Sequence, residues 1–224
     1  MSRELPILFS GPMVRAILDG RKTQTRRVIK PRYRDDESGF QVCTNKATGE
    51  RWVEKADEHG GSFDAPRYVL PRYQPGDVLW VRETWFYEWH MYEITDGYPD
   101  LPGGRYRHRY VYKADEPDYP VNTGVGAWGW HPSIHMLREA ARLFLRVTAV
   151  RAERVQDITE ADAQAEGFRG FDELTDGADA ELFDLTAREG FRFYWDCLPH
   201  KRGFGWEENP WVWVYEFERL EDYR

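Results

Sequence analysis

Cysteine is scarce in this chain of 224 residues, and long apolar runs are missing from it. The two cysteines, Cys43 and Cys197, lie far apart in the sequence, so neither a disulfide framework nor a four-cysteine zinc site is expected. No stretch reaches the ~18 consecutive apolar residues of a membrane-spanning helix, and the segment from Met1 to Pro12 lacks the pattern of a signal peptide. We therefore expect a cytoplasmic protein with no membrane partner.

Sequence motifs for nucleotide and metal chemistry are also lacking. Gly124 and Gly126 have no third glycine after them and no expected strand before them, and no Gly-Lys-Ser/Thr sequence occurs. His131 and His135 have the spacing of a helical ligand pair, but Pro132 places His131 outside a helix and no third ligand is suitably spaced. The sequence therefore predicts neither a metal ion nor a cofactor.

What the chain does contain is a composition typical of one globular domain. Hydrophobic residues make up 41%, charged residues 31%, and aromatic residues 16% with ten tryptophans, which favours a well-filled core. The clearest expected strands are Val78–Trp85, Leu143–Val150 and Trp211–Phe217, and short helical patterns lie between them. Thr159 and Asp162 predict a capped helix that Gly167 ends, and the segment from Pro132 to Ala140 is expected to be helical or turn-like. Four or five strands without regular βαβ alternation indicate an α+β fold with a mostly antiparallel, barrel-like sheet. Apolar periodicity is lost over about 31–73 and 88–131, so we expect a single domain, 1–224, with two insertions.

Charge is distributed unevenly along the sequence. The net charge is −8, yet the segment from Arg15 to Arg34 has eight basic residues and one acid, which leaves the rest of the chain at −15. One basic edge on an acidic body indicates a local anionic partner. The alternative interpretation is a solvated charged face without a partner.

The strongest candidate for chemistry is the segment from Gly20 to Arg27, which combines an amine, two hydroxyls and three guanidinium groups at an expected junction of helix and strand. A hydroxyl becomes a useful nucleophile when a neighbouring base accepts its proton. A lysine that is desolvated and crowded by arginines has a lowered pKa, so Lys22 is a candidate base for Thr25. The alternative is a solvated loop with threonines that merely suit a strand.

Three motifs in this chain resemble those of the ASCH domain family, which belongs to the PUA-like superfamily. They are the sequence Gly-Arg-Lys-Thr-x-Thr at 20–25, the Pro-Gly-Asp turn and following strand at 75–79, and the stretch at 158–167 that ends in Glu166 and Gly167. The segments 132–136 and 209–213 are similar to a larger ASCH-related group that is common in phages and prophages. The resemblance implies a PUA-like fold, a mixed and mostly antiparallel β-barrel with short flanking helices and two insertions.

The resemblance also implies site residues. Some small bacterial members are acetylcytidine amidohydrolases, and their catalytic lysine, threonine and glutamate correspond to Lys22, Thr25 and Glu166 of this chain. Their chemistry implies that Thr25 is the nucleophile, Lys22 its activator and Glu166 the general acid and base. The expected substrate-binding residues form one further set: Arg21, Arg26, Arg27, Arg82 and Trp85.

Three functions remain open at this point. The first is a metal-independent amidohydrolase that acts on an N-acylated cytidine nucleoside. The second is a noncatalytic module that binds RNA or a modified base, since PUA-like folds often have this role and the basic segment suits phosphate. The third is an ASCH-type ribonuclease that uses the same lysine and glutamate on a ribose hydroxyl. In each case the partner is a modified nucleoside or RNA.

Overall fold

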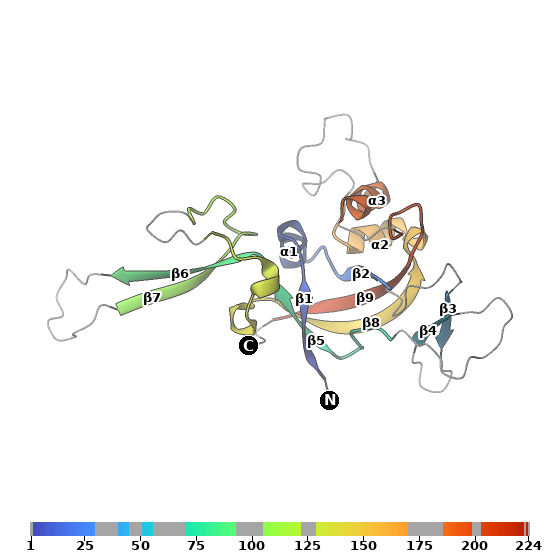
Figure 1. Cartoon of the computed structure of the whole chain (residues 1–224), viewed down its shortest axis with the longest axis horizontal. Helices are drawn as coiled ribbons and strands as arrows, with labels where there is room; N and C mark the ends of the chain where they lie inside the picture. Colours follow the sequence, from blue (N-terminus) through green and yellow to red (C-terminus); the bar gives the residue numbers. More distant parts are fainter. Residues whose placement is uncertain are drawn as a thin grey trace.

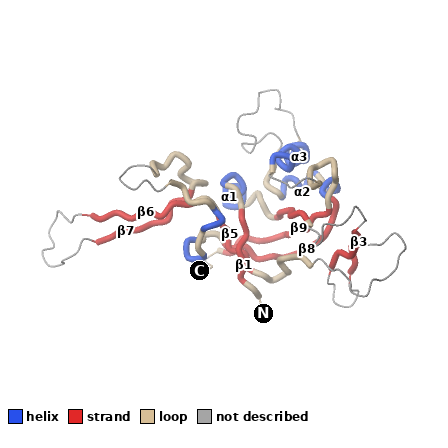
Figure 2. The backbone as a smooth tube through the Cα atoms, viewed as in Figure 1, coloured by secondary structure: helices blue, strands red, loops and turns tan. Residues whose placement is uncertain are grey.

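A computed structural model of the chain describes residues 2–29, 40–44, 51–55, 70–92, 105–121, 129–169, 186–198, 203–221 and 223. Three helices lie over one face of a five-stranded sheet with strand order β1-β5-β8-β9-β2 (Figures 1 and 2). The sheet strands are β1 (Glu4–Leu8), β5 (Val78–Arg82), β8 (Phe144–Arg154), β9 (Trp211–Leu220) and β2 (Gln24–Val28). The helices are α1 (Gly11–Leu18), α2 (Glu160–Ala165) and α3 (Ala187–Cys197). Among the residues listed above, no helix is long and apolar enough to cross a membrane.

The expectation of an α+β fold with a mostly antiparallel sheet is confirmed. Among the described strands of the main sheet, β1 and β5 pair in parallel, whereas β5·β8, β8·β9 and β2·β9 are antiparallel. Within the described strands the sheet does not close into a barrel, because β1 and β2 are its two edges and no ladder joins them. The fold therefore has an open seam between its first two strands.

Two separate hairpins come from the segments expected to be insertions. They are β3 (Phe40–Thr44) with β4 (Arg51–Lys55), and β6 (Trp85–Tyr92) with β7 (Arg105–Tyr112). The β6–β7 hairpin projects away from the main sheet as an arm (Figure 1). The single strand expected over 78–85 is wrong at its end, since β5 stops at Arg82 and Trp85 starts the arm.

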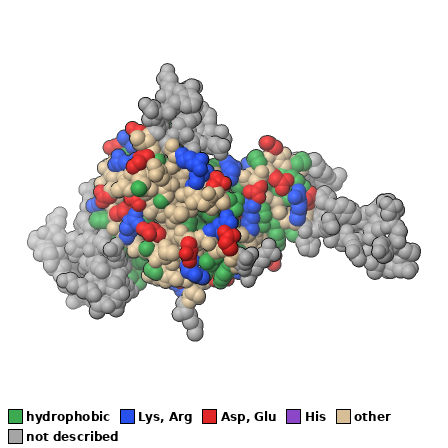
Figure 3. All heavy atoms as spheres, turned by 180° about the vertical axis from the view of Figure 1, so that it is seen from behind, with side chains coloured by type: hydrophobic (Ala, Val, Ile, Leu, Met, Phe, Trp, Pro, Cys, Tyr) green, Lys and Arg blue, Asp and Glu red, His purple; other side chains and the backbone are tan. Residues whose placement is uncertain are grey.

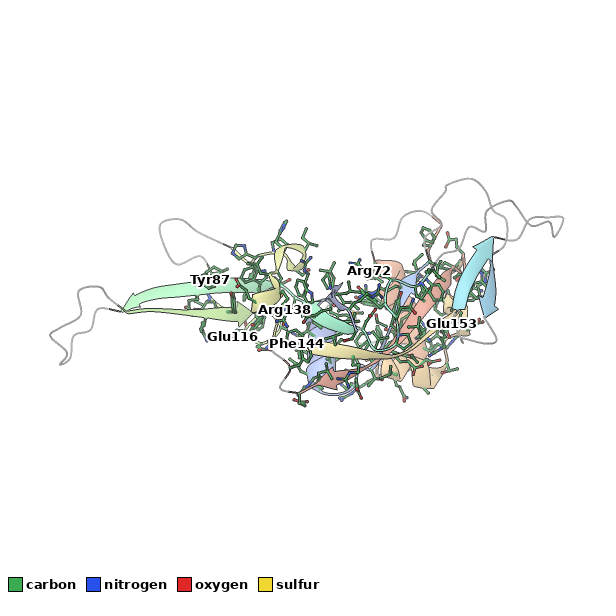
Figure 4. The ribbon with its side chains drawn as sticks, turned by 90° about the horizontal axis from the view of Figure 1, so that it is seen from below. Arg72, Tyr87, Glu116, Arg138, Phe144 and Glu153 are labelled. Carbon is green, nitrogen blue, oxygen red and sulfur yellow. The ribbon has the colours of Figure 1, made fainter. Side chains whose placement is uncertain are left out.

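The core of the main sheet is formed where β8 pairs with both of its neighbours. Leu79, Leu145 and Val214 are fully buried, as the apolar runs of their strands predict. Strand β8 runs along the sheet from Phe144 to Glu153 (Figure 4). Its far end therefore brings Glu153 towards the site described below.

Helix α2 begins and ends where the sequence predicts. The Thr159 hydroxyl accepts the Asp162 backbone N–H at 3.0 Å, and the Asp162 carboxylate binds the Thr159 hydroxyl and N–H in return. Gly167 ends the helix with a φ of +104°, a conformation that glycine adopts without a steric penalty. The segment expected to be helical or turn-like from Pro132 to Ala140 forms two short 3-10 turns, η1 (Ser133–His135) and η2 (Arg138–Ala140).

Candidate functional site

A cavity of about 390 Å³ lies at the open seam, beside α3. Its walls come from the end of β1 and the start of α1, from β2, from Glu166 after α2, and from α3. The lining residues are Leu8, Phe9, Ser10, Met13, Thr25, Arg26, Arg27, Thr84, Ser133, Glu166, Phe191, Tyr194, Trp195 and Leu198. The Arg27 Nη2 donates to the Leu8 carbonyl at 2.7 Å and so crosses the seam.

Lys22 and Glu166 meet behind this cavity in a buried ion pair. Lys22 Nζ lies 2.7 Å from Glu166 Oε2, and the two side chains are 0% and 2% exposed. Nζ also donates to the carbonyl oxygens of Gln24 and Glu166, each at 2.9 Å. An ammonium has three N–H donors, so all of them are used.

Arg26 holds the other oxygen of Glu166. Its Nη1 lies 3.1 Å from Glu166 Oε1, while Nε and Nη2 bind Glu153 Oε1 at 2.9 and 2.5 Å. Asp162 adds a longer ion pair at 3.5 Å. With both carboxylate oxygens bound, Glu166 is fixed in orientation towards the cavity, as a preorganised acid–base group requires.

This ion cluster continues to the protein surface through Arg151. Its guanidinium binds Glu153, Asp162 and Glu216, and it also reaches the Gln24 side-chain oxygen at 3.4 Å. Gln24 in turn donates to Asp162 Oδ1 at 3.0 Å. Alternating charges of this kind compensate one another, which reduces the cost of burying Arg26 and Glu166.

Burial has a direct effect on Lys22. Desolvation lowers the pKa of the Lys22 ammonium, Glu166 opposes this change by raising the pKa, and Arg27 and Arg26 lower it further. The net pKa lies below the ordinary lysine value. Burial penalises the charged ammonium, and the contact with Glu166 offsets only part of this penalty.

Thr25 faces the cavity from β2. Its side chain is buried, with 2% exposure, and among the described residues its hydroxyl has no hydrogen-bond partner. A hydroxyl that faces a cavity without a hydrogen-bond partner from the described residues is available to a ligand. Lys22 does not line the cavity, whereas Thr25 and Glu166 do.

Two glycine turns bring these groups together from distant parts of the sequence. Gly20, with φ +73°, ends α1 just before Lys22, and Gly167 ends α2 just after Glu166. The Lys22 backbone N–H donates to the Ala16 carbonyl at 2.9 Å, and the Thr23 N–H donates to the carbonyl at position 165 at 2.8 Å. The loop that carries Lys22 is thus fastened to both helices.

The structure does not bring every expected residue into the cavity. Arg21 fastens the two turns instead, because its Nη1 donates to the Gly167 carbonyl at 2.8 Å. Arg82 stacks on the Trp80 ring at 4.5 Å and donates to the Ile134 carbonyl at 3.1 Å. Trp85 is buried against Met136 at the base of the arm. Of the eight expected site residues, four line the cavity, Lys22 supports one of them, and Arg21, Arg82 and Trp85 lie elsewhere.

Several lining residues were not expected from the sequence. The aromatic wall of α3 consists of Phe191, Tyr194 and Trp195, which recur three and four residues apart and so share one side of the helix. Phe9 lies between the ends of β1 and α1, and its ring contacts the Arg27 guanidinium with the centroid 5.3 Å away. Helical spacing of aromatics was visible in the sequence, but it did not distinguish a cavity wall from core.

The basic segment is only partly a surface feature. The Lys22 and Arg26 side chains are 0% exposed and paired with acids, so they present no charge to a large external partner. On the face shown in Figure 3, basic and acidic side chains are interspersed. We therefore expect this segment to contact a ligand inside the cavity and not on the outer surface.

Comparison with known proteins gives no further assignment. No family model matches the chain, no curated protein matches it, and no solved structure matches it.

Proposed function

We propose that this protein is a metal-independent amidohydrolase that removes the acyl group from an N-acylated cytidine. The observation that carries the proposal is the cavity in which an unpartnered hydroxyl, Thr25, accompanies a carboxylate, Glu166, that is oriented by two buried cations. Amide hydrolysis requires a nucleophile and a group that moves protons, and these two residues meet that requirement. The apolar and aromatic walls suit a flat base.

In the first step, the Thr25 oxygen attacks the acyl carbon while Glu166 takes the hydroxyl proton. The tetrahedral intermediate collapses when the C–N bond breaks, and Glu166 returns the proton to the departing exocyclic nitrogen. The products of this step are the free nucleobase amine and an acyl ester on Thr25. Glu166 is the member of the ion pair that meets the substrate.

In the second step, water replaces the amine. Glu166 accepts a proton from the water, the resulting hydroxide attacks the ester carbon, and the Thr25 oxygen leaves and regains a proton. Lys22 acts through Glu166 as a positioning residue, since all three of its N–H groups already have acceptors. Its contact with Glu166 Oε2 at 2.7 Å holds the carboxylate in place while the charge in the cavity changes.

The proposal includes a PUA-like fold. In this proposal the sheet is an incomplete barrel, and the seam between β1 and β2 is where it stays open. The end of β1 and the middle of β2 line the cavity, so the proposed site lies beside this seam.

The test is release of carboxylate from N4-acetylcytidine by the purified protein in the presence of a chelator. We expect Thr25→Ala and Glu166→Gln each to reduce kcat by at least about a hundredfold, because each removes a group that bonds or transfers a proton in the transition state. The matched control is Thr23→Ala, which removes an exposed hydroxyl from the same motif outside the cavity and should leave kcat unchanged.

A folded wild-type protein that is inert towards N-acylated cytidines would refute the hydrolase. Salt-dependent binding of RNA by that inert protein would favour the binding module instead. Cleavage of RNA to fragments with 2′,3′-cyclic phosphate ends would favour the ribonuclease.

A further inference from the structure

Charge is not balanced inside the cavity. Arg26, Arg27 and Glu166 are the charged residues that line it. Arg26 is paired with Glu153 and Glu166, and Glu166 is also paired with Lys22. Arg27 has no carboxylate partner among the described residues. The cavity thus contains one guanidinium whose charge is not compensated by a carboxylate in the described part of the chain.

The contacts of Arg27 leave most of its donors free. A guanidinium has five N–H groups, and the described contacts of Arg27 are one hydrogen bond to the Leu8 carbonyl and the face of the Phe9 ring. These contacts fix the position of the guanidinium without neutralising it. Forked donors of this type match the paired oxygens of a phosphate or carboxylate.

The start of α1 lies at the same wall. Ser10 is the N-cap residue, yet its side chain makes no capping hydrogen bond, and the first turn has no acidic residue. Ser10 and Met13 line the cavity together with Arg27. The partial positive charge of a helix N-terminus favours an anion at this place, in addition to the attraction of Arg27.

The rest of the cavity suits a planar, uncharged ring. Phe9 contributes one aromatic side chain, and Phe191 and Tyr194 contribute others from α3. An anion at Arg27 and a flat ring beside the aromatic side chains correspond to the phosphate and the base of a nucleotide. A free nucleoside would fill the apolar part and leave Arg27 without a counter-charge.

We propose that the substrate of this site is a phosphorylated nucleoside, with Arg27 as the residue that binds its phosphate. This inference rests on the proposed amidohydrolase for the N-acylated base, and it adds the phosphate ester to the substrate. The phosphate can belong to a mononucleotide or to the end of an RNA chain.

The experiment compares kcat/KM for N4-acetylcytidine, its 5′-monophosphate, its 3′-monophosphate and a short RNA that ends in N4-acetylcytidine. We expect at least about a tenfold preference for a phosphorylated substrate over the nucleoside, because charge-assisted hydrogen bonds are strong in a partly desolvated site. Arg27→Gln should remove this preference by slowing the phosphorylated substrate and not the nucleoside. Arg82→Gln, outside the cavity, is the control and should change neither value.

The outcomes separate the two proposals. Equal or faster turnover of the free nucleoside by wild type would overturn the phosphate inference and leave the amidohydrolase intact. If no acylated substrate is turned over, the proposed amidohydrolase activity is refuted. Calorimetric titration with CMP and cytidine then tests whether Arg27 binds a phosphate. Tighter binding of CMP than of cytidine by wild type, with the difference lost in Arg27→Gln, would support it, and equal binding would refute it. Among the phosphorylated substrates, the fastest one identifies the mononucleotide or the RNA end as the source.

Discussion

At the scale of single residues, the site depends on a glycine, which has no side chain that could react with or bind a ligand. Gly167 has a φ of +104°, and a Cβ added there would lie 3.0 Å from the Ala16 Cβ and 3.4 Å from the Lys22 Cβ. Both the backbone conformation and the space therefore require glycine. Its neighbour Glu166 is directed at Lys22 by this turn.

We predict that Gly167→Ala destabilises the protein by about 1–3 kcal/mol and lowers activity, since it strains the backbone and pushes on α1 and Lys22. Denaturant unfolding measures the first effect, and kcat measures the second. The control is Gly20→Ala, where φ is also positive but nothing lies within 4 Å of the added Cβ. That variant should cost only about 1–2 kcal/mol, from the left-handed conformation alone. Equal costs for the two variants would argue against a steric role of Gly167.

The burial of Lys22 and Arg26 could not be predicted from the sequence around them. Both lie in a strongly basic segment, which on local evidence predicts an exposed edge. Their partners Glu166 and Glu153 are more than 120 residues away in the chain, so no local pattern records the pairing. The convergence of Lys22 and Glu166 was expected only from the resemblance to ASCH domains. The carboxylate at Glu153 was not expected at all.

At the scale of elements, α3 is attached to the molecule through α2. The Glu160 carboxylate at the start of α2 accepts the backbone N–H groups of Ala187 and Arg188 at 2.8 and 3.0 Å. An acid at this position satisfies free donors at the start of α3 and interacts favourably with the helix dipole. The aromatic wall of the cavity is thereby held in place.

We predict that Glu160→Ala destabilises the protein by about 1–2 kcal/mol and raises KM more than it lowers kcat, because α3 is loosened while Thr25 and Glu166 stay in place. Thermal unfolding and steady-state kinetics are the measurements. Glu207→Ala is a suitable control, since it removes an exposed ion pair with Arg192 on α3 that is worth about 0–1 kcal/mol. An unchanged KM in Glu160→Ala would show that α3 does not form the binding wall.

Elements with strong local signals were predictable. The reciprocal Thr159–Asp162 cap placed α2, and the apolar runs of β8 and β9 placed the two central strands. The split between β5 and β6 was not predictable, because neither glycine nor proline interrupts the sequence between Val78 and Trp85, and the charged Arg82 and Glu83 are compatible with a continuing strand. A tertiary interaction lies where the two strands separate. The buried Glu83 is bound by Arg142, whose Nε lies 2.8 Å from Glu83 Oε1.

At the scale of the whole molecule, the stability of the fold depends on alkaline pH through a buried tyrosine, Tyr215, and a partly buried one, Tyr112. Burial raises the pKa of Tyr215, in the main core, and of Tyr112, at the base of the arm, from 10.0 to about 12. The folded state then holds these protons more tightly than the unfolded state. The stability that they contribute is complete below pH 10 and is lost as the pH rises towards 12.

We therefore expect the free energy of unfolding to fall steeply above pH 10, and tyrosinate absorbance to rise together with the loss of circular dichroism. Tyr215→Phe and Tyr112→Phe should each make this fall less steep, because each removes one group that titrates differently in the two states. Ionisation of Tyr112 before Tyr215 would show that the arm opens independently of the main sheet.

The strand order has a consequence for how the protein is made. Among the described strands, the neighbour of β2 is β9, which comes far later in the sequence. Thr25, Arg26 and Arg27 leave the ribosome well before Trp211–Leu220, so their strand has no neighbour to join until β9 has been synthesised. The cavity wall that β2 provides is thus completed only after β9 has emerged, and a nascent chain that stops before Trp211 has no position for β2 in the described sheet.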